Sequence, residues 1–140
     1  MTSPEVVQTA RIVLQDPDGH YYGFIRPLSS NQRGGSLDMS GGRVDSGELP
    51  AAAAVREVHE ETGVIIRGPV DFLYGVSDNG GGKWFTRWVY SCQERVTVAD
   101  IRQLPEHIGL VCASKATILE LITFPAHVEA LNCHGDAVVA

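Results

Sequence analysis

Three glutamates in the segment 41–64 could carry out metal chemistry. Glu57, Glu60 and Glu61 lie three and four residues apart, so on an α-helix, which turns about 100° per residue, their side chains share one arc. Like charges at these spacings cost about 0.2–0.5 kcal/mol per pair on a helix surface. A divalent cation would offset the repulsion, and clustered carboxylate oxygens are ligands that suit Mg²⁺ or Mn²⁺. From spacing alone, a solvated acidic face is the more frequent explanation of such a charge run.

The sequence around these acids predicts the helix that must hold them. Pro50 suits a first helical turn, four alanines follow it at 51–54, and Gly63 supplies a C-terminal stop. The acidic arc is shared only with Pro50 and Ala53, whose small side chains would leave room for a substrate to approach. A separate, packed face is predicted to consist of Ala51, Ala54, Val55, Val58 and Thr62.

This segment resembles the Nudix box, the signature of the Nudix hydrolase family. The pattern reads Gly, five residues, Glu, seven residues, Arg-Glu, an aliphatic residue, any residue, Glu-Glu, any residue, Gly and an aliphatic residue. All nine constrained positions match, and across 23 residues this is a specific signal. They are filled by Gly42, Glu48, Arg56, Glu57, Val58, Glu60, Glu61, Gly63 and Val64. Relatives commonly have a proline before the two glycines, where this chain has Ser40, a difference expected to affect loop stiffness more than chemistry.

The resemblance implies an α/β fold, an α/β/α sandwich with a mixed central β-sheet, in which residues 1–140 form a single Nudix hydrolase domain. It also implies metal-dependent hydrolysis of the diphosphate linkage in a nucleoside diphosphate linked to another group. Mg²⁺ is the expected cofactor, with Mn²⁺ as the alternative. The expected metal ligands are the carboxylates of Glu57, Glu60 and Glu61 and a backbone carbonyl of Gly41 or Gly42.

Arg56 is expected to orient the acids through charge-assisted hydrogen bonds, and it can reach Glu60 four residues on. Glu48, at the start of the helix, is expected to be either a partner of Arg56 or a helix cap rather than a catalytic group.

Four acids are candidates for the general base. Glu57 is one candidate, and Glu94, Asp100 and Glu106 on later segments are the others. Each of those three, taken singly, is more often an ordinary surface acid.

Two residues are candidates for binding substrate. Arg26, at a strand end, resembles the place where relatives hold a substrate phosphate, and the alternative is a surface arginine. Trp84 lies beside a glycine-rich loop and would stack on a base, although a tryptophan on a strand is more often part of the core.

The substrate expected by default is a nucleoside triphosphate or a similar small nucleotide. The segment between Pro69 and Pro105 contains no proline, which disfavours the ADP-ribose pattern of the family. Open alternatives are an ADP-ribose or other nucleotide-sugar pyrophosphatase and a non-catalytic nucleotide-sensing Nudix domain. The complete set of box acids argues against a sensor, because a sensor would be free to lose them.

The composition narrows the functional classes further. With 44% hydrophobic and 20% charged residues, the chain is typical of a globular protein. Its net charge of −6 argues against binding nucleic acid polymers or anionic membranes. Three widely spaced cysteines predict free thiols, and the start of the chain lacks a signal-peptide pattern, so a cytoplasmic protein is expected. The expected partner is a small nucleotide, and a homodimer is left open.

Periodicity and turn residues predict the remaining elements. A hairpin is expected from strands at 6–15 and 21–26, joined by a turn at 16–20. Further strands are expected at 37–40 and 84–93, and extended segments at 64–66 and 70–77. A glycine-rich loop is expected at 78–83, helices at 97–104, 114–123 and 125–131, and a frayed tail at 132–140.

Overall fold

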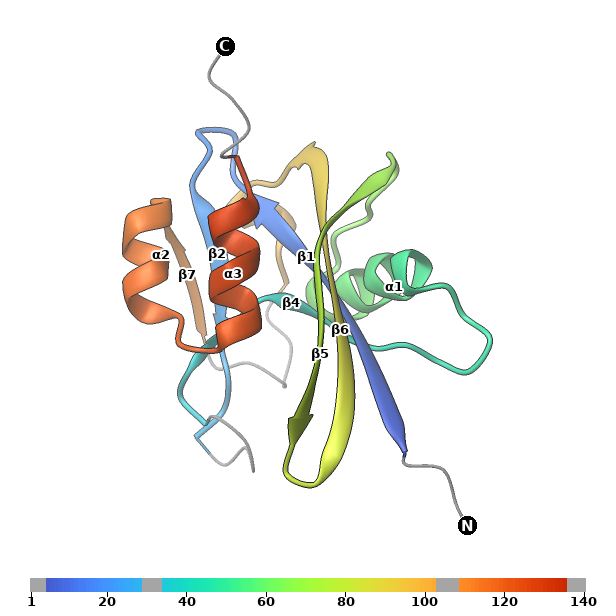
Figure 1. Ribbon diagram of the computed structural model, residues 1–140. Coiled ribbons are helices and arrows are strands. Elements are labelled where there is room, and N and C mark those ends of the chain that lie inside the picture. The colour runs from blue at the N-terminus through green and yellow to red at the C-terminus, as the bar shows by residue number, and fades with distance from the viewer. Residues whose placement is uncertain (1–4, 29–33, 103–108, 136–140) are drawn as a thin grey trace.

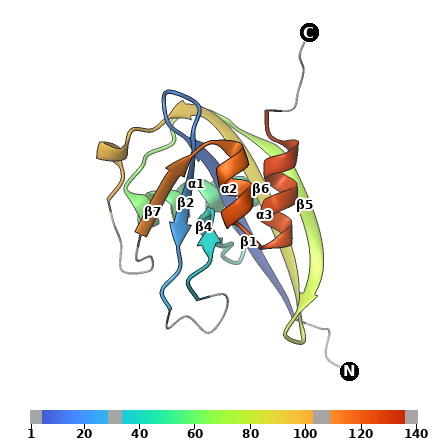
Figure 2. The same cartoon turned by 90° about the vertical axis from the view of Figure 1, so that its left-hand side faces the viewer.

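The computed structural model describes residues 5–28, 34–102 and 109–135, which form a β-sheet covered by helices on both faces (Figures 1 and 2). No helix in these ranges is long and apolar enough to cross a membrane. The elements are β1 (Val6–Gln15), β2 (Tyr21–Ile25), β3 (Leu37–Asp38), β4 (Ser40–Arg43), α1 (Pro50–Thr62), β5 (Val70–Gly80), β6 (Lys83–Arg95), the 3₁₀-helix η1 (Val98–Asp100), β7 (Gly109–Ala113), α2 (Lys115–Leu121) and α3 (Pro125–Cys133).

The sheet is mixed. Its strand order is β3-β2-β1-β6-β5, with β4 paired to β1 and β7 paired to β2. The long strands β1 and β6 run parallel, whereas β5 with β6 and β4 with β1 are antiparallel. This arrangement confirms the expected α/β sandwich with a mixed central sheet.

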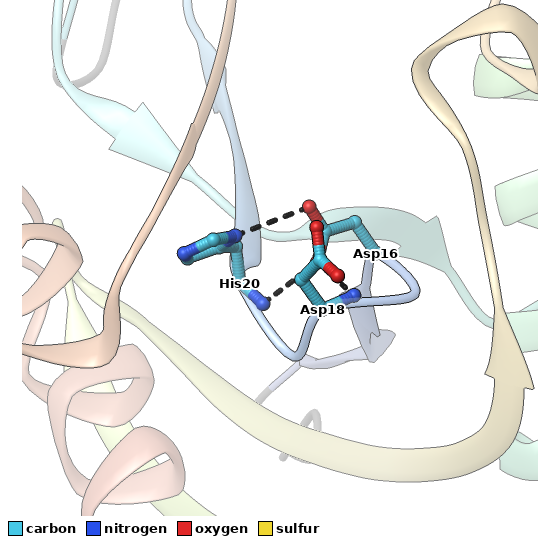
Figure 3. A group of neighbouring side chains, drawn as sticks. All are labelled: Asp16, Asp18 and His20. Carbon is cyan, nitrogen blue, oxygen red and sulfur yellow. Dashed lines mark hydrogen bonds and ion pairs between the residues drawn. The ribbon is translucent and has the colours of Figure 1, made fainter.

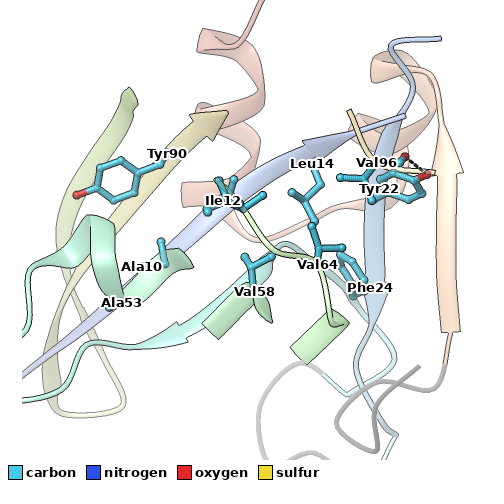
Figure 4. Close-up of a cluster of buried hydrophobic side chains, with 12 residues drawn as sticks. Ala10, Ile12, Leu14, Tyr22, Phe24, Ala53, Val58, Val64, Tyr90 and Val96 are labelled. Carbon is cyan, nitrogen blue, oxygen red and sulfur yellow. Dashed lines mark hydrogen bonds between the residues drawn. The ribbon is translucent and has the colours of Figure 1, made fainter. Parts of the chain in front are cut away.

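Alternation along the strands divides the core into two layers. On β1, Ile12 and Leu14 pack in the layer that contains Ala53 and Val58 of α1 (Figure 4). Val13, between them in sequence, points to the other face. There it joins a second cluster with residues of α2 and α3, namely Ile118, Ala130 and Leu131. Successive side chains of a strand point to opposite faces, so one strand supplies both layers.

Helix α1 ends as predicted but packs differently. Gly63 adopts a left-handed conformation, with φ of +81°, and its N–H donates to the His59 carbonyl. Ala54, Val58 and Thr62 are buried as expected. Ala53 was expected to lie beside the acids in an open space, and this was wrong: it is fully buried in the core.

Several predicted boundaries were wrong. The extended segment at 64–66 joins no strand of the sheet, and the loop expected at 78–83 is a tight hairpin in which only Gly81 and Gly82 lie between β5 and β6. The helix expected at 97–104 is reduced to η1, as far as the described residues go, and α3 continues to Cys133. Strand β7 was not predicted. The three cysteines are free thiols, as expected.

Candidate active site

The acidic arc of α1 lies over strand β4. Arg56 donates from Nη2 to the Arg43 carbonyl at 3.0 Å, and Glu57 lies against Gly42. Later residues of the helix therefore lie over earlier residues of the strand. The strand and the helix run antiparallel and position the segment 40–43 against the glutamates.

Arg56 ties the acids of this segment together. Its Nη1 donates to Glu57 at 2.9 Å and to Glu60 at 3.1 Å. Its Nε and Nη2 donate to the two carboxylate oxygens of Glu48, both at 2.9 Å. A planar guanidinium can hold one carboxylate bidentately while it donates to others. The predicted contact from Arg56 to Glu60 is confirmed, and the same nitrogen atom donates to both Glu57 and Glu60.

Glu48 is a partner of Arg56, as one of the two expectations had it. Hydrogen bonds from Arg56, followed by one from the Asp45 N–H, lower the pKa of Glu48 to about 2. The same ion pair, with a further contribution from Glu57, raises the pKa of Arg56. The residue that caps α1 is Leu49, without a side-chain cap hydrogen bond, so the capping role for Glu48 is not observed.

Two glycines of β4 make close approaches that a side chain would prevent. A Cβ placed on Gly42 would overlap the Glu57 carboxylate, and one placed on Gly41 would overlap the backbone of β1. Gly41 also has a φ of +153°, which disfavours other residues. The strand therefore brings its backbone close to a carboxylate, as an oxygen-ligand metal site requires.

The three glutamates differ in their surroundings. The Glu57 side chain is 22% exposed and the Glu60 side chain 57% exposed, whereas Glu61 is buried with 8% of its surface accessible. Arg56 links Glu57 and Glu60, but the ligand atoms of the three acids do not all lie within 4.8 Å of one another, so the structure does not bring them into one close group. The carboxylate oxygens of the three glutamates are hard donors of the kind that Mg²⁺ or Mn²⁺ prefers. Gly42, which has no side chain, leaves the space beside Glu57 open.

A different cluster brings its ligand atoms closer together. Asp16, Asp18 and His20, in the turn between β1 and β2, have one ligand atom each within 4.8 Å of one another, the one such group of three in the described part of the chain (Figure 3). Spacing of histidines in the sequence did not reveal it. Asp16 accepts hydrogen bonds from the backbone N–H groups of Asp18 and His20, at 2.9 and 2.8 Å. These bonds stabilise the turn and account for the cluster.

Arg26 lies in a buried ionic network at the edge of the sheet. Its Nη1 donates at 2.9 Å to Asp38, which is 1% exposed. Arg11 Nη1 and His127 Nδ1 lie 3.4 and 3.1 Å from the same carboxylate. Asp38 and His127 could not be recognised from the sequence, because their contacts join segments far apart in the chain.

Trp84 begins β6 and pairs in register with Val6 of β1. It is 45% exposed, so it is not a core residue. Its neighbour on the same face, Trp88, pairs with Ala10, a residue of the core layer under α1. Trp84 therefore lies on the α1 face of the sheet, toward its far end, whereas Arg26 contacts the network that includes His127 of α3. The structure does not bring these two candidates together.

The acids proposed as alternatives to Glu57 for the general base have other contacts. Glu94 accepts from the Gly68 N–H at 2.5 Å, and Asp100 forms a capping box with Thr97. The hydrogen bonds from the side chain and backbone of Thr97 lower the pKa of Asp100. Both acids line a cavity of about 360 Å³ beyond the C-terminal end of α1. Glu106 lies outside the described residues.

Comparison with known proteins finds a family model and relatives that this chain resembles in sequence and in fold. The model of the NUDIX domain family matches residues 7–125. The chain is 33% identical over 61 residues to an 8-oxo-dGTP diphosphatase of Haemophilus influenzae, a match that covers 44% of each chain. It spans less than half of that relative's length.

Two solved structures share the fold at lower identity. A MutT protein from Methanosarcina mazei Go1 superimposes with a TM-score of 0.80 at 21% identity, over 94% of both chains. The NUDIX domain of Shewanella oneidensis NrtR, complexed with ADP ribose, gives a TM-score of 0.71 at 16% identity, over 94% of this chain and 88% of that one.

Proposed function

Since the chain belongs to the NUDIX domain family, we propose that it is a metal-dependent pyrophosphohydrolase, which cleaves the diphosphate linkage of a nucleoside diphosphate joined to another group. The observation that carries the proposal is the arrangement of α1 over β4. There one guanidinium nitrogen of Arg56 donates hydrogen bonds to Glu57 and Glu60. The absence of a side chain at Gly42 lets the Glu57 carboxylate lie against the strand. A purely structural helix would gain nothing from three acids near its C-terminal end, where the helix dipole favours cations.

Glu57, Glu60, Glu61 and the Gly41 carbonyl would hold the cation, Mg²⁺ or Mn²⁺. Such a cation, when bound, neutralises phosphate charge and makes water a stronger nucleophile. Arg56 holds two of the carboxylates in place, and Glu48 in turn fixes the plane of its guanidinium. This contact pattern supports a positioning role for Arg56 and Glu48.

The reaction needs one proton acceptor and no redox partner. The oxygen of a water molecule bonds to one phosphorus, the bridging P–O bond of the anhydride breaks, and the bridging oxygen leaves with its electron pair on the second phosphate. The proton of the water passes to a general base. We assign this role to Glu57, because Arg56 holds it beside Glu60 and it lies against Gly42, whereas Glu94 and Asp100 line the cavity beyond α1.

We propose a nucleoside triphosphate or a similar small nucleotide as the substrate. The relative from Haemophilus influenzae is named for a nucleoside triphosphate, and its similarity supports this class. The NrtR domain complexed with ADP ribose supports the alternatives, a nucleotide-sugar pyrophosphatase or a nucleotide-sensing domain. In the proposal, Arg26 and Trp84 stay separate candidates, Arg26 for a substrate phosphate and Trp84 for a base, because the structure does not bring them together.

A nucleotide panel tests the function and separates these classes. Nucleoside triphosphates, an oxidised guanine triphosphate and ADP-ribose would each be incubated with the protein and Mg²⁺, with and without chelator, and the phosphate and pyrophosphate products measured. We expect turnover of a triphosphate that the chelator abolishes. Tight binding without turnover of any member would favour the sensor, and turnover of ADP-ribose alone would favour the nucleotide-sugar class.

A further inference from the structure

Ser40 carries a buried hydroxyl that makes no hydrogen bond within the described structure. The residue begins β4, is 1% exposed, and its Oγ has no partner. A buried polar group without a partner is unfavourable, so such groups are rare and call for an explanation.

The register of β4 fixes the face to which Ser40 points. It pairs with Ile12 of β1, and Gly42 pairs with Ala10. Cross-strand partners point to the same face, and Ala10 and Ile12 both point toward α1 (Figure 4). The Ser40 hydroxyl therefore lies between the sheet and α1, on the face where Gly42 meets Glu57.

The direction of α1 identifies the residue above Ser40. Arg56 contacts Arg43, and Glu57 contacts Gly42, so moving forward along the helix means moving backward along the strand. Ser40 lies two residues before Gly42, about 6.6 Å along a strand. Glu61 lies four residues after Glu57, about 6 Å along a helix. Both Ser40 and Glu61 are buried, as residues that face one another across a packed interface must be.

We propose that Ser40 is a positioning residue of the metal site. Its hydroxyl donates a hydrogen bond to the Glu61 carboxylate in the cation-bound enzyme and keeps that carboxylate directed toward the cation. The inference rests on the proposed function, because it assigns a role to Ser40 within the same site. It gives a role to a buried hydroxyl that has no hydrogen-bond partner in the described part of the chain.

The proposal predicts opposite effects of Ser40→Ala on two quantities. The variant removes an unpartnered buried hydroxyl, so the midpoint of thermal unfolding in EDTA should stay unchanged or rise. It also removes a group that orients a metal ligand, so the dissociation constant for Mn²⁺ should rise by about tenfold. A merely structural serine would show the reverse, a lower midpoint in EDTA and unchanged affinity.

Both quantities can be measured on the full chain. Mn²⁺ alone would be titrated into the EDTA-treated and dialysed protein by calorimetry, and unfolding followed by circular dichroism. Ser77→Ala is the matched control. Ser77 lies on β5, where its hydroxyl contacts Thr86, away from β4. This control should bind Mn²⁺ as the wild type does.

The outcomes separate the two proposals. A change in Mn²⁺ affinity of less than about threefold for Ser40→Ala, or a lowered midpoint in EDTA, would overturn the role of Ser40 while leaving the enzyme proposal intact. A wild-type protein that neither binds Mn²⁺ nor hydrolyses any nucleotide would overturn the proposed function itself.

Discussion

At the scale of single residues, Glu60 and Glu61 are neighbours in sequence with opposite surroundings. Glu60 is largely exposed and contacts Arg56, whereas Glu61 is buried. Replacing either by glutamine keeps the size of the side chain and removes its charge. If each ligates the cation, Glu60→Gln and Glu61→Gln should each lower kcat/KM on the order of a hundredfold or more. Nucleotide hydrolysis in saturating Mg²⁺ measures this.

The control for these variants is Glu120→Gln, on the exposed side of α2. It should keep full activity. Circular dichroism should show that all three variants remain folded. An unchanged rate for Glu60→Gln or Glu61→Gln would remove that residue from the metal site.

Residue-scale prediction from sequence succeeded where the chemistry is local. The spacing of the box placed Arg56 within reach of Glu60 and placed Glu48 close enough to be its partner, and both contacts are present. The surroundings of Arg26 were not predictable in the same way. Its partner Asp38 is buried, and the nearby His127 comes from a helix about 90 residues further along the chain.

At the scale of elements, the approach of α1 to β4 depends on Gly42. Because a Cβ at this position would overlap the Glu57 carboxylate, Gly42→Ala should displace that carboxylate or push the helix outward. We expect the affinity for Mn²⁺ to fall by about 10–100-fold. Calorimetric titration of Mn²⁺ measures this loss.

Gly80→Ala is the matched control for that prediction. Its added Cβ would make an ordinary contact of 3.5 Å with Phe85, in a part of β5 away from α1. It should bind Mn²⁺ normally. Equal affinities for Gly42→Ala and the wild type would show that Glu57 does not need this close approach.

Elements with strong local signals were predictable, and those that depend on distant partners were not. Helix α1 has good helix formers and a glycine stop, and β6 has aromatic and β-branched residues, so both were found. Strand β7 has the short sequence GLVCA without clear alternation, and it exists through pairing with β2. Gly81 and Gly82 both have positive φ, which suits a two-residue hairpin and converts the expected loop into a tight turn.

At the scale of the whole molecule, a protein with a net charge of −6 is proposed to bind an anionic substrate. Long-range attraction cannot supply this binding, so the positive charge must be local. A cation between the acids of α1 would supply it and would also relieve the repulsion among them. By holding that cation, the box acids would allow a chain of net negative charge to bind an anionic nucleotide.

The same charges make the stability of the fold depend on pH through Glu48. Its pKa lies at about 2 in the folded protein, below the ordinary value of 4.5. Between these values the unfolded chain binds the proton first, so the ion pair with Arg56 contributes fully above pH 4.5, and its contribution is lost as pH falls toward 2. Glu48→Gln should therefore unfold more easily than the wild type at pH 7, and the difference should shrink steadily between pH 4.5 and 2. Urea unfolding across this range, with Glu120→Gln as the control, measures the difference. A gap between wild type and Glu48→Gln that stayed constant down to pH 2 would show that the ion pair does not govern this part of the acid response.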